Sequence, residues 1–189
     1  MTIRGVTTSR PHAAKPNHKN ETAAAMRGRY IHTALAEMSA SNFRKIPAWV
    51  DKSTEAYVSI RRAQAWLLDH DAETIMAERS VAYKTSDGTT VLGRIDLLAY
   101  ITGDDGAKEI ALIDYKTEDR RAYELDAQKQ IRAWSYQLLE YIRGIPERYK
   151  PDSAVIIHLP RQSVAKIRKA KVTACETDDK KELTSVRTH

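Results

Sequence analysis

Cysteine is nearly absent from this 189-residue chain, in which Cys175 is the only one. A single thiol excludes a disulfide scaffold and any cluster held by several cysteines of one chain. Long apolar runs are missing too: no stretch approaches the roughly 20 apolar residues of a membrane span, and the N-terminus lacks the apolar core of a signal peptide. We therefore expect a soluble, cytoplasmic protein without a membrane partner.

The remaining composition is that of a globular protein, with 42% hydrophobic and 30% charged residues. At roughly 150 residues per domain, the length predicts one domain with tails. We expect a flexible basic arm over residues 1–20, a single domain over 21–175 and a polar tail over 176–189.

The net charge of +6 is concentrated in two segments that contain no acidic residue, 1–20 and 160–173. The rest of the chain is slightly acidic. One interpretation is that both segments are solvated surface. The other is that they bind phosphates around an acidic centre that binds cations. In the second segment, the candidates for contact with nucleic acid are Lys166, Arg168 and Lys169.

Apolar periodicity predicts an α/β (α+β) protein, in which helices pack on a sheet of about four to five strands. Helices are expected over residues 21–40, 51–69 and 122–143. Strands are expected over residues 75–84, 89–101, 108–116 and 153–159, with a further edge strand over 164–173.

Three acidic residues are predicted to meet on this sheet. The turn near residues 104–105 sets Asp96 opposite residue 113 or 114, and the Asp87-Gly88 turn sets Glu78 opposite residue 97. Glu78, Asp96 and Asp114 then lie on three adjacent strands at one level. Lys116 lies two residues after Asp114 and projects from the same face.

Carboxylates in apolar strands need a partner, because an unpaired buried charge is costly. Salt bridges from Asp114 to Lys116 or from Asp96 to Arg94 are one solution. An oxygen-ligand site for Mg²⁺ or Mn²⁺ is the other. His32, at the edge of an apolar helical stripe, suits either a structural role or a metal ligand.

Five short motifs occur in a characteristic order. Gly28-Arg29-Tyr30-Ile31-His32 lies on a helix and is followed by Glu78. Gly93-Arg94-Ile95-Asp96 and Ile113-Asp114-Tyr115-Lys116-Thr117 then lie on strands, and Gln130 lies on the next helix. This order resembles the RecB-like exonuclease branch of the PD-(D/E)xK nuclease superfamily, in stand-alone phage or virus form. Members that hold an iron–sulfur cluster use four cysteines, so we expect no such cluster here.

The resemblance implies a restriction-endonuclease-like core with a mixed central sheet flanked by helices. It also implies one or two Mg²⁺ or Mn²⁺ ions, bound by His32, Asp96, Asp114 and the backbone carbonyl of Tyr115.

The resemblance also implies roles for residues around the metal. Lys116 would position or activate the attacking water, and Gln130 would support the site. A Gln four residues before a Tyr is typical of the family, yet Gln130 is followed by Trp134, whereas Gln137 is followed by Tyr141. We prefer Gln130 because it lies nearer to Lys116 in the sequence.

Glu78 would be an auxiliary acid, and Arg94 would contact phosphate. Arg27 and Arg29, close to His32 in the sequence, are further candidates for contact with nucleic acid, although solvated surface is an equal alternative for both.

The function implied is a metal-dependent DNA exonuclease that hydrolyses phosphodiester bonds of linear DNA in recombination, repair or replication. The expected partners are DNA, with free ends or single-stranded, and proteins of recombination or replication. The expected location is the cytoplasm of a bacterium or of a virus-infected cell. The alternatives are an endonuclease of the same fold, cutting structured DNA or RNA, and a non-catalytic DNA-binding relative.

Overall fold

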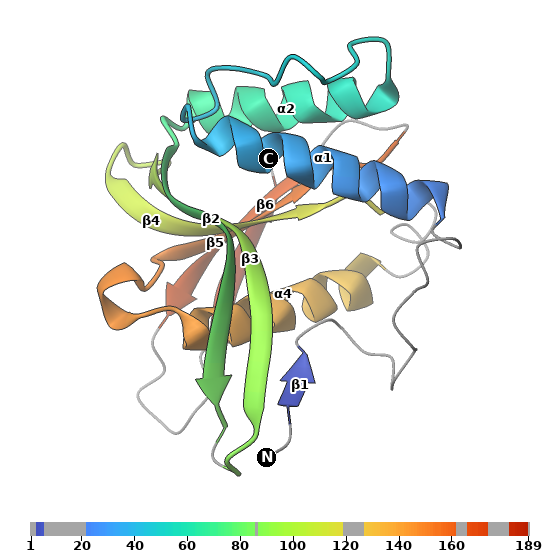
Figure 1. Ribbon diagram of the computed structural model, residues 1–189. Helices are drawn as coiled ribbons and strands as arrows, with labels where there is room; N and C mark the ends of the chain where they lie inside the picture. The colour runs from blue at the N-terminus through green and yellow to red at the C-terminus, as the bar shows by residue number, and fades with distance from the viewer. Residues whose placement is uncertain are drawn as a thin grey trace.

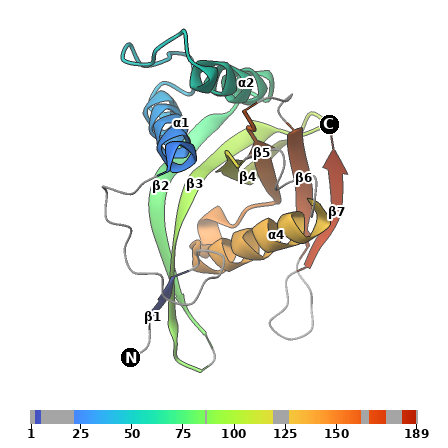
Figure 2. The same ribbon diagram turned by 90° about the vertical axis from the view of Figure 1, so that its right-hand side faces the viewer.

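A central sheet with helices on both faces organises the protein (Figures 1 and 2). The computed structural model describes residues 3–5, 22–85, 87–118, 127–161, 166–173 and 182–188. The helices are α1 (Ala23–Ser39), α2 (Glu55–Asp69), α4 (Ala127–Gly144) and the 3-10 helix η2 (Glu147–Tyr149). The strands are β1 (Ile3–Gly5), β2 (Glu73–Lys84), β3 (Thr90–Thr102), β4 (Lys108–Lys116), β5 (Ser153–His158), β6 (Lys166–Thr173) and β7 (Glu182–Thr188).

The strands form one mixed sheet in the order β1-β3-β4-β5-β6-β7, with β2 paired to β3. The β1–β3 and β4–β5 pairs are parallel, and the other pairs are antiparallel. Since β2 follows nearly the whole length of β3, strands β1 and β4 share the other edge of β3. The predicted mixed sheet flanked by helices is confirmed. The sequence patterns do not predict β1 or β7, and Cys175 lies outside the described residues.

Two hydrophobic cores cover the two faces of the sheet. Helices α1 and α2 bury residues such as Leu35 and Leu67 against one face, and α4 buries Trp134 and Leu138 against the other. All six residues of β5 are buried, as expected for a strand covered on both sides. Among the described residues, no helix combines the length and apolar character that crossing a bilayer requires.

Glycine turns set the register of the β2–β3–β4 meander. Gly88 and Gly106 have φ values of 80° and 79°, in the left-handed region that suits glycine. In the β3–β4 pair, Leu97 lies opposite Ile113, so the same register continued places Asp96 opposite Asp114, as predicted.

The β2–β3 register differs from the prediction by one residue. Ala77, rather than Glu78, lies opposite Leu97. Glu78 is therefore level with Asp96 itself, which draws the two acids together.

Candidate active site

Glu78 and Asp96 lie at the point where the paired strands β2 and β3, the β2–β3 ribbon, switch the core into which a given face of the ribbon packs. Ile95 and Leu97 are two residues apart and should share a face. Instead, Ile95 belongs to the core under α4, and Leu97 to the core under α1 and α2. The backbone cause lies on β2, where Glu78 has a φ of 49°, a left-handed conformation that is unusual for a non-glycine residue. The local twist turns both carboxylates toward α1.

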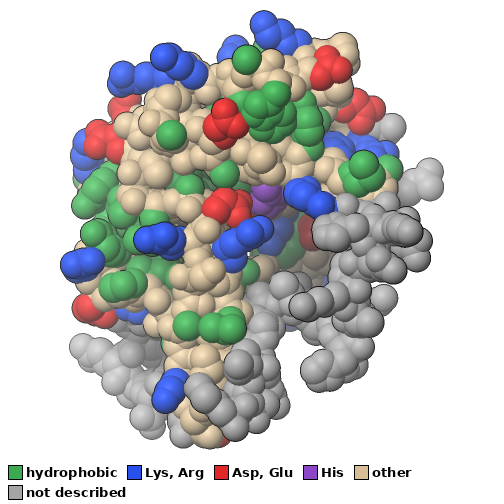
Figure 3. Space-filling model, viewed as in Figure 1, with side chains coloured by type: hydrophobic (Ala, Val, Ile, Leu, Met, Phe, Trp, Pro, Cys, Tyr) green, Lys and Arg blue, Asp and Glu red, His purple; other side chains and the backbone are tan. Residues whose placement is uncertain are grey.

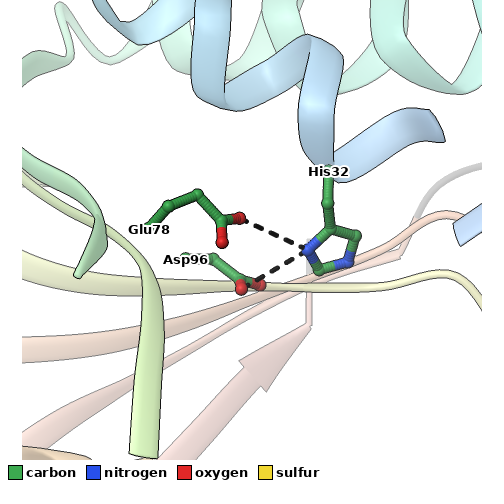
Figure 4. Close-up of side chains that lie close together, drawn as sticks. All are labelled: His32, Glu78 and Asp96. Carbon is green, nitrogen blue, oxygen red and sulfur yellow. Dashed lines mark ion pairs between the residues drawn. The ribbon is translucent and has the colours of Figure 1, made fainter. Parts of the chain in front are cut away.

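Helix α1 places His32 over these two carboxylates (Figure 4). His32 Nδ1 lies 3.4 Å from Asp96 Oδ1 and 3.9 Å from Glu78 Oε1. The other Asp96 oxygen, Oδ2, accepts a 2.8 Å hydrogen bond from the Tyr115 backbone N–H. The Tyr115 ring meets the His32 ring edge-on, with centroids 5.8 Å apart. The imidazole and the two acids are therefore held by three different elements.

Asp114 and Lys116 form a second group on the same strand. Lys116 Nζ lies 2.7 Å from Asp114 Oδ2 and donates a 2.8 Å hydrogen bond to Gln137 Oε1. Gln137 Nε2 in turn donates to the Tyr141 hydroxyl at 2.5 Å. Asp114 Oδ2 is buried, and the ammonium approaches it without the alignment of a hydrogen bond. The lysine is thus fixed between a strand carboxylate and an amide from α4.

The Tyr141 ring packs against Gly93, the first residue of the motif that contains Asp96. A Cβ atom at Gly93 would collide with Cε1 of the Tyr141 ring. Glycine is required here by the close approach of the ring. Gly93 therefore connects the strand of Asp96 to the amide that holds Lys116.

Burial and mutual repulsion perturb the acids of this site. Burial, assisted by the charge of Asp96, raises the pKa of Asp114 to about 6, although Lys116 opposes the shift. Burial and the charge of Asp96 likewise raise the pKa of Glu78, against the opposing charges of Arg94 and His32. Raised carboxyl pKa values mark sites where negative charges are crowded together, which a cation would relieve.

The two basic groups hold their protons more tightly than usual. Burial alone would lower the pKa of Lys116, but the negative charge of Asp114 in close contact outweighs it, and the net pKa is raised. The pKa of His32 is also raised, since the hydrogen bond and charge of Asp96 outweigh burial. Lys116 is accordingly an ammonium at neutral pH.

The comparison with protein families identifies this arrangement. A sequence profile described as PD-(D/E)XK nuclease superfamily matches residues 8–189. The chain belongs to this superfamily. No curated protein matches it. Among solved structures, the crystal structure of SSO0001 aligns at 15% identity with a TM-score of 0.37, covering 76% of this chain and 61% of that one.

Nucleases of this superfamily use divalent metal ions, and the residues present fit one. His32, Glu78 and Asp96 each offer a ligand atom, and these atoms lie within 4.8 Å of one another. Imidazole and carboxylate donors suit Mn²⁺, and carboxylates suit Mg²⁺. Asp114, the other expected ligand, offers a buried oxygen that the lysine leaves incompletely satisfied.

The structure places the expected site residues in two adjoining groups. His32, Asp96 and the auxiliary acid Glu78 form one cluster. Asp114 and Lys116 form the ion pair beside it, and Tyr115 lies between them on β4. Figure 3 shows acidic, basic and histidine side chains meeting at the hollowed centre of one face.

The hydrogen bonds of the site favour Gln137 over the preferred Gln130 for the supporting role beside Lys116. Helix α4 begins at Ala127, so Gln130 lies in its first turn, and Gln137 lies two turns further on the same side. Gln137 is the residue that reaches Lys116. The Gln137–Tyr141 spacing was the signal that could have found it, because both residues join the hydrogen-bond network.

Arg27 makes hydrogen bonds within the fold, and its assignment to nucleic acid stays a prediction. Its guanidinium donates to the backbone carbonyls of Thr117 and Leu159 at 3.2 Å and to Ser59 Oγ at 2.7 Å. These bonds tie α1 to α2 and to the ends of β4 and β5. Helix packing is close there, since a Cβ atom at Gly28 would lie 2.7 Å from Thr117 Oγ1.

The other basic candidates lie around the site. Arg94 pairs through Nε with Glu78 Oε2 at 2.9 Å, rather than with Asp96, and its side chain is 67% exposed. Arg29 is exposed on α1. Lys166, Arg168 and Lys169 lie on β6, where the backbone of Arg168 pairs with Ile156, the β5 partner of Asp114.

Proposed function

We propose that the protein is a metal-dependent deoxyribonuclease that degrades linear DNA from its ends, in recombination, repair or replication. The observation that best supports this proposal is that His32, Glu78 and Asp96 converge beside the Asp114–Lys116 pair. The superfamily supports DNA hydrolysis, and the Gly-x-x-x-His and Gln-x-x-x-Tyr spacings support the exonuclease branch.

In this proposal, His32, Asp96, Asp114 and Glu78 hold one or two Mg²⁺ or Mn²⁺ ions. A bound ion would polarise the phosphate and lower the pKa of a coordinated water. The residues of the chain orient this chemistry: the Tyr115 N–H fixes the Asp96 carboxylate, and burial keeps water away from Asp114.

Lys116 serves as a fixed positive charge beside the phosphate. Its raised pKa keeps it protonated, so it stabilises negative charge rather than removing a proton. Gln137 Oε1 accepts a hydrogen bond from the ammonium and thereby sets its direction. Arg94, exposed beside Glu78, is placed to meet an adjoining phosphate.

The test is incubation of the purified protein with end-labelled linear DNA and with closed circular DNA, in Mg²⁺, Mn²⁺ or chelator. We expect the linear DNA to be degraded only with metal and the circle to be spared. Cleavage in chelator would refute a metal-dependent nuclease. Cleavage of the circle would show an endonuclease instead, and binding without any cleavage would show a non-catalytic relative.

Lysine variants of one strand provide a matched pair for this assay. Lys116→Ala should slow cleavage by roughly 100-fold or more, as expected for the loss of a charge aimed at the reacting group. Lys108, at the other end of β4, also forms an ion pair with an acid, Glu73, at 2.6 Å. Lys108→Ala should leave the cleavage rate unchanged.

A further inference from the structure

A pair of aromatic rings stands on the outside of α1 and takes no part in the site described above. Trp49, in the segment between α1 and α2, is 44% exposed. Its indole ring meets Tyr30 edge-on, with centroids 5.1 Å apart and planes at 89°. We call Tyr30 and Trp49 the aromatic platform.

Hydrogen bonds fix both rings of the platform. Trp49 Nε1 donates to Glu37 Oε2 at 2.7 Å, and the Tyr30 hydroxyl accepts from the Asp51 backbone N–H at 2.8 Å. A ring that is already held in place loses little conformational entropy when a flat ligand stacks on it. The exposed indole is therefore suited to binding rather than to packing the core.

The platform lies at the same level of α1 as His32. Tyr30 and His32 are two residues apart, or about 3 Å along the helix axis. Their side chains leave opposite flanks of the helix, and exposed Arg29 lies on the arc between them. Figure 3 shows hydrophobic side chains gathered above a histidine on one face, with a basic side chain beside the histidine.

The charges around the platform favour a polyanion with accessible bases. Arg44, Lys45 and Lys52 are exposed in the segment that carries Trp49. Glu37, at the edge of the indole, repels a phosphate from the ring itself but not a neutral base. In a duplex, the faces of internal bases are covered by their neighbours, whereas every base of a single strand offers a face for stacking.

We propose, on the basis of the nuclease function proposed above, that Trp49 stacks on an unpaired base of single-stranded DNA. Tyr30 and Glu37 hold the indole, and the nearby basic residues bind the backbone. The platform would thus direct a single strand, or the frayed end of a duplex, over α1 toward His32.

The test is fluorescence anisotropy of a short oligothymidylate and of a blunt duplex, both in chelator so that neither is cleaved. Trp49→Ala should weaken binding of the single strand by roughly 5- to 100-fold and leave binding of the duplex unchanged. Trp49→Phe, which keeps a ring, should lose less. Tyr136, 68% exposed on α4 across the sheet, supplies the control Tyr136→Ala, which should change neither affinity.

Tryptophan fluorescence gives an independent signal. Trp134 is 1% exposed, and Trp66 stacks on His70 with centroids 4.1 Å apart. Quenching by oligothymidylate should therefore come from Trp49 and disappear in Trp49→Phe. Unchanged single-strand affinity in Trp49→Ala, or an equal loss of affinity for the duplex, would overturn the proposal. This holds even if an apolar protein partner is found to bind the platform. Because these assays contain no metal, they are independent of whether the protein cleaves DNA.

Discussion

Glu78 is a residue at which the proposed metal binding and the stability of the fold oppose each other, and two substitutions separate them. Its φ of 49° costs a non-glycine residue about 1–2 kcal/mol. Glu78→Gly removes this cost, although the more flexible unfolded chain takes back about 0.5–1 kcal/mol. Glu78→Gln keeps the cost. Both variants lose the carboxylate and its ion pair with Arg94, so the difference between them reports the backbone conformation together with the packing of the uncharged Gln side chain.

The Gly variant should therefore be more stable than the Gln variant by about 0.5–1 kcal/mol. For a chain of this length, that difference corresponds to about 1–4 °C in Tm. Differential scanning calorimetry in chelator measures it. Isothermal titration measures the affinity for Mn²⁺, the second part of the prediction. Both variants lose one of three clustered donors and should bind the ion roughly tenfold more weakly or worse.

The stability prediction and the metal-affinity prediction can fail separately. A Gln variant that melts at or above the Gly variant would show that the left-handed backbone stores no strain. Wild-type Mn²⁺ affinity in both variants would show that Glu78 is not a ligand. Either result would contradict the view that the ribbon is distorted in order to bring this carboxylate to His32.

Two further predictions concern the Lys116 side of the site. Gln137→Ala removes a hydrogen bond to a charged group, about 1.5–3 kcal/mol, so the single-turnover cleavage rate should fall roughly 10- to 100-fold. Gln130→Ala is the control, and an equal loss there would contradict the assignment of the supporting role to Gln137. Burial raises the pKa of Asp114 from its ordinary 3.8 to about 6, so the folded protein retains a proton that the unfolded chain releases. The metal-free protein should lose stability from about pH 4 to pH 6, while Mn²⁺ binding strengthens; Tm measured against pH should lose this slope in Asp114→Asn.

The sequence was sufficient to predict the level at which Asp96 and Asp114 meet, because a tight turn determines the register of β3 and β4, whereas the register predicted for β2 and β3 was off by one residue. Asp96 opposite Asp114 followed from counting residues around a turn whose Gly106 has the expected positive φ. The left-handed Glu78 could not be predicted in this way. It arises from tertiary packing, in which the paired strands β2 and β3 contribute side chains to both hydrophobic cores.

Long-range contacts were less predictable. The choice between Gln130 and Gln137 depended on how α4 follows β4, which distance along the chain does not determine. In the sequence, nothing distinguishes Arg27 from an exposed cation. Its acceptors are backbone carbonyls distant in sequence, and no side-chain pattern marks them.

Arg27 also determines when the site can first exist during synthesis. Its acceptors lie 90 and 132 residues further along the chain. A nascent chain that ends before β5 contains His32, Asp96, Asp114 and Lys116, but α1 has no anchor at Leu159, and β4 lacks the parallel neighbour that covers Asp114. We therefore expect the site to assemble only after the chain through Leu159 has left the ribosome.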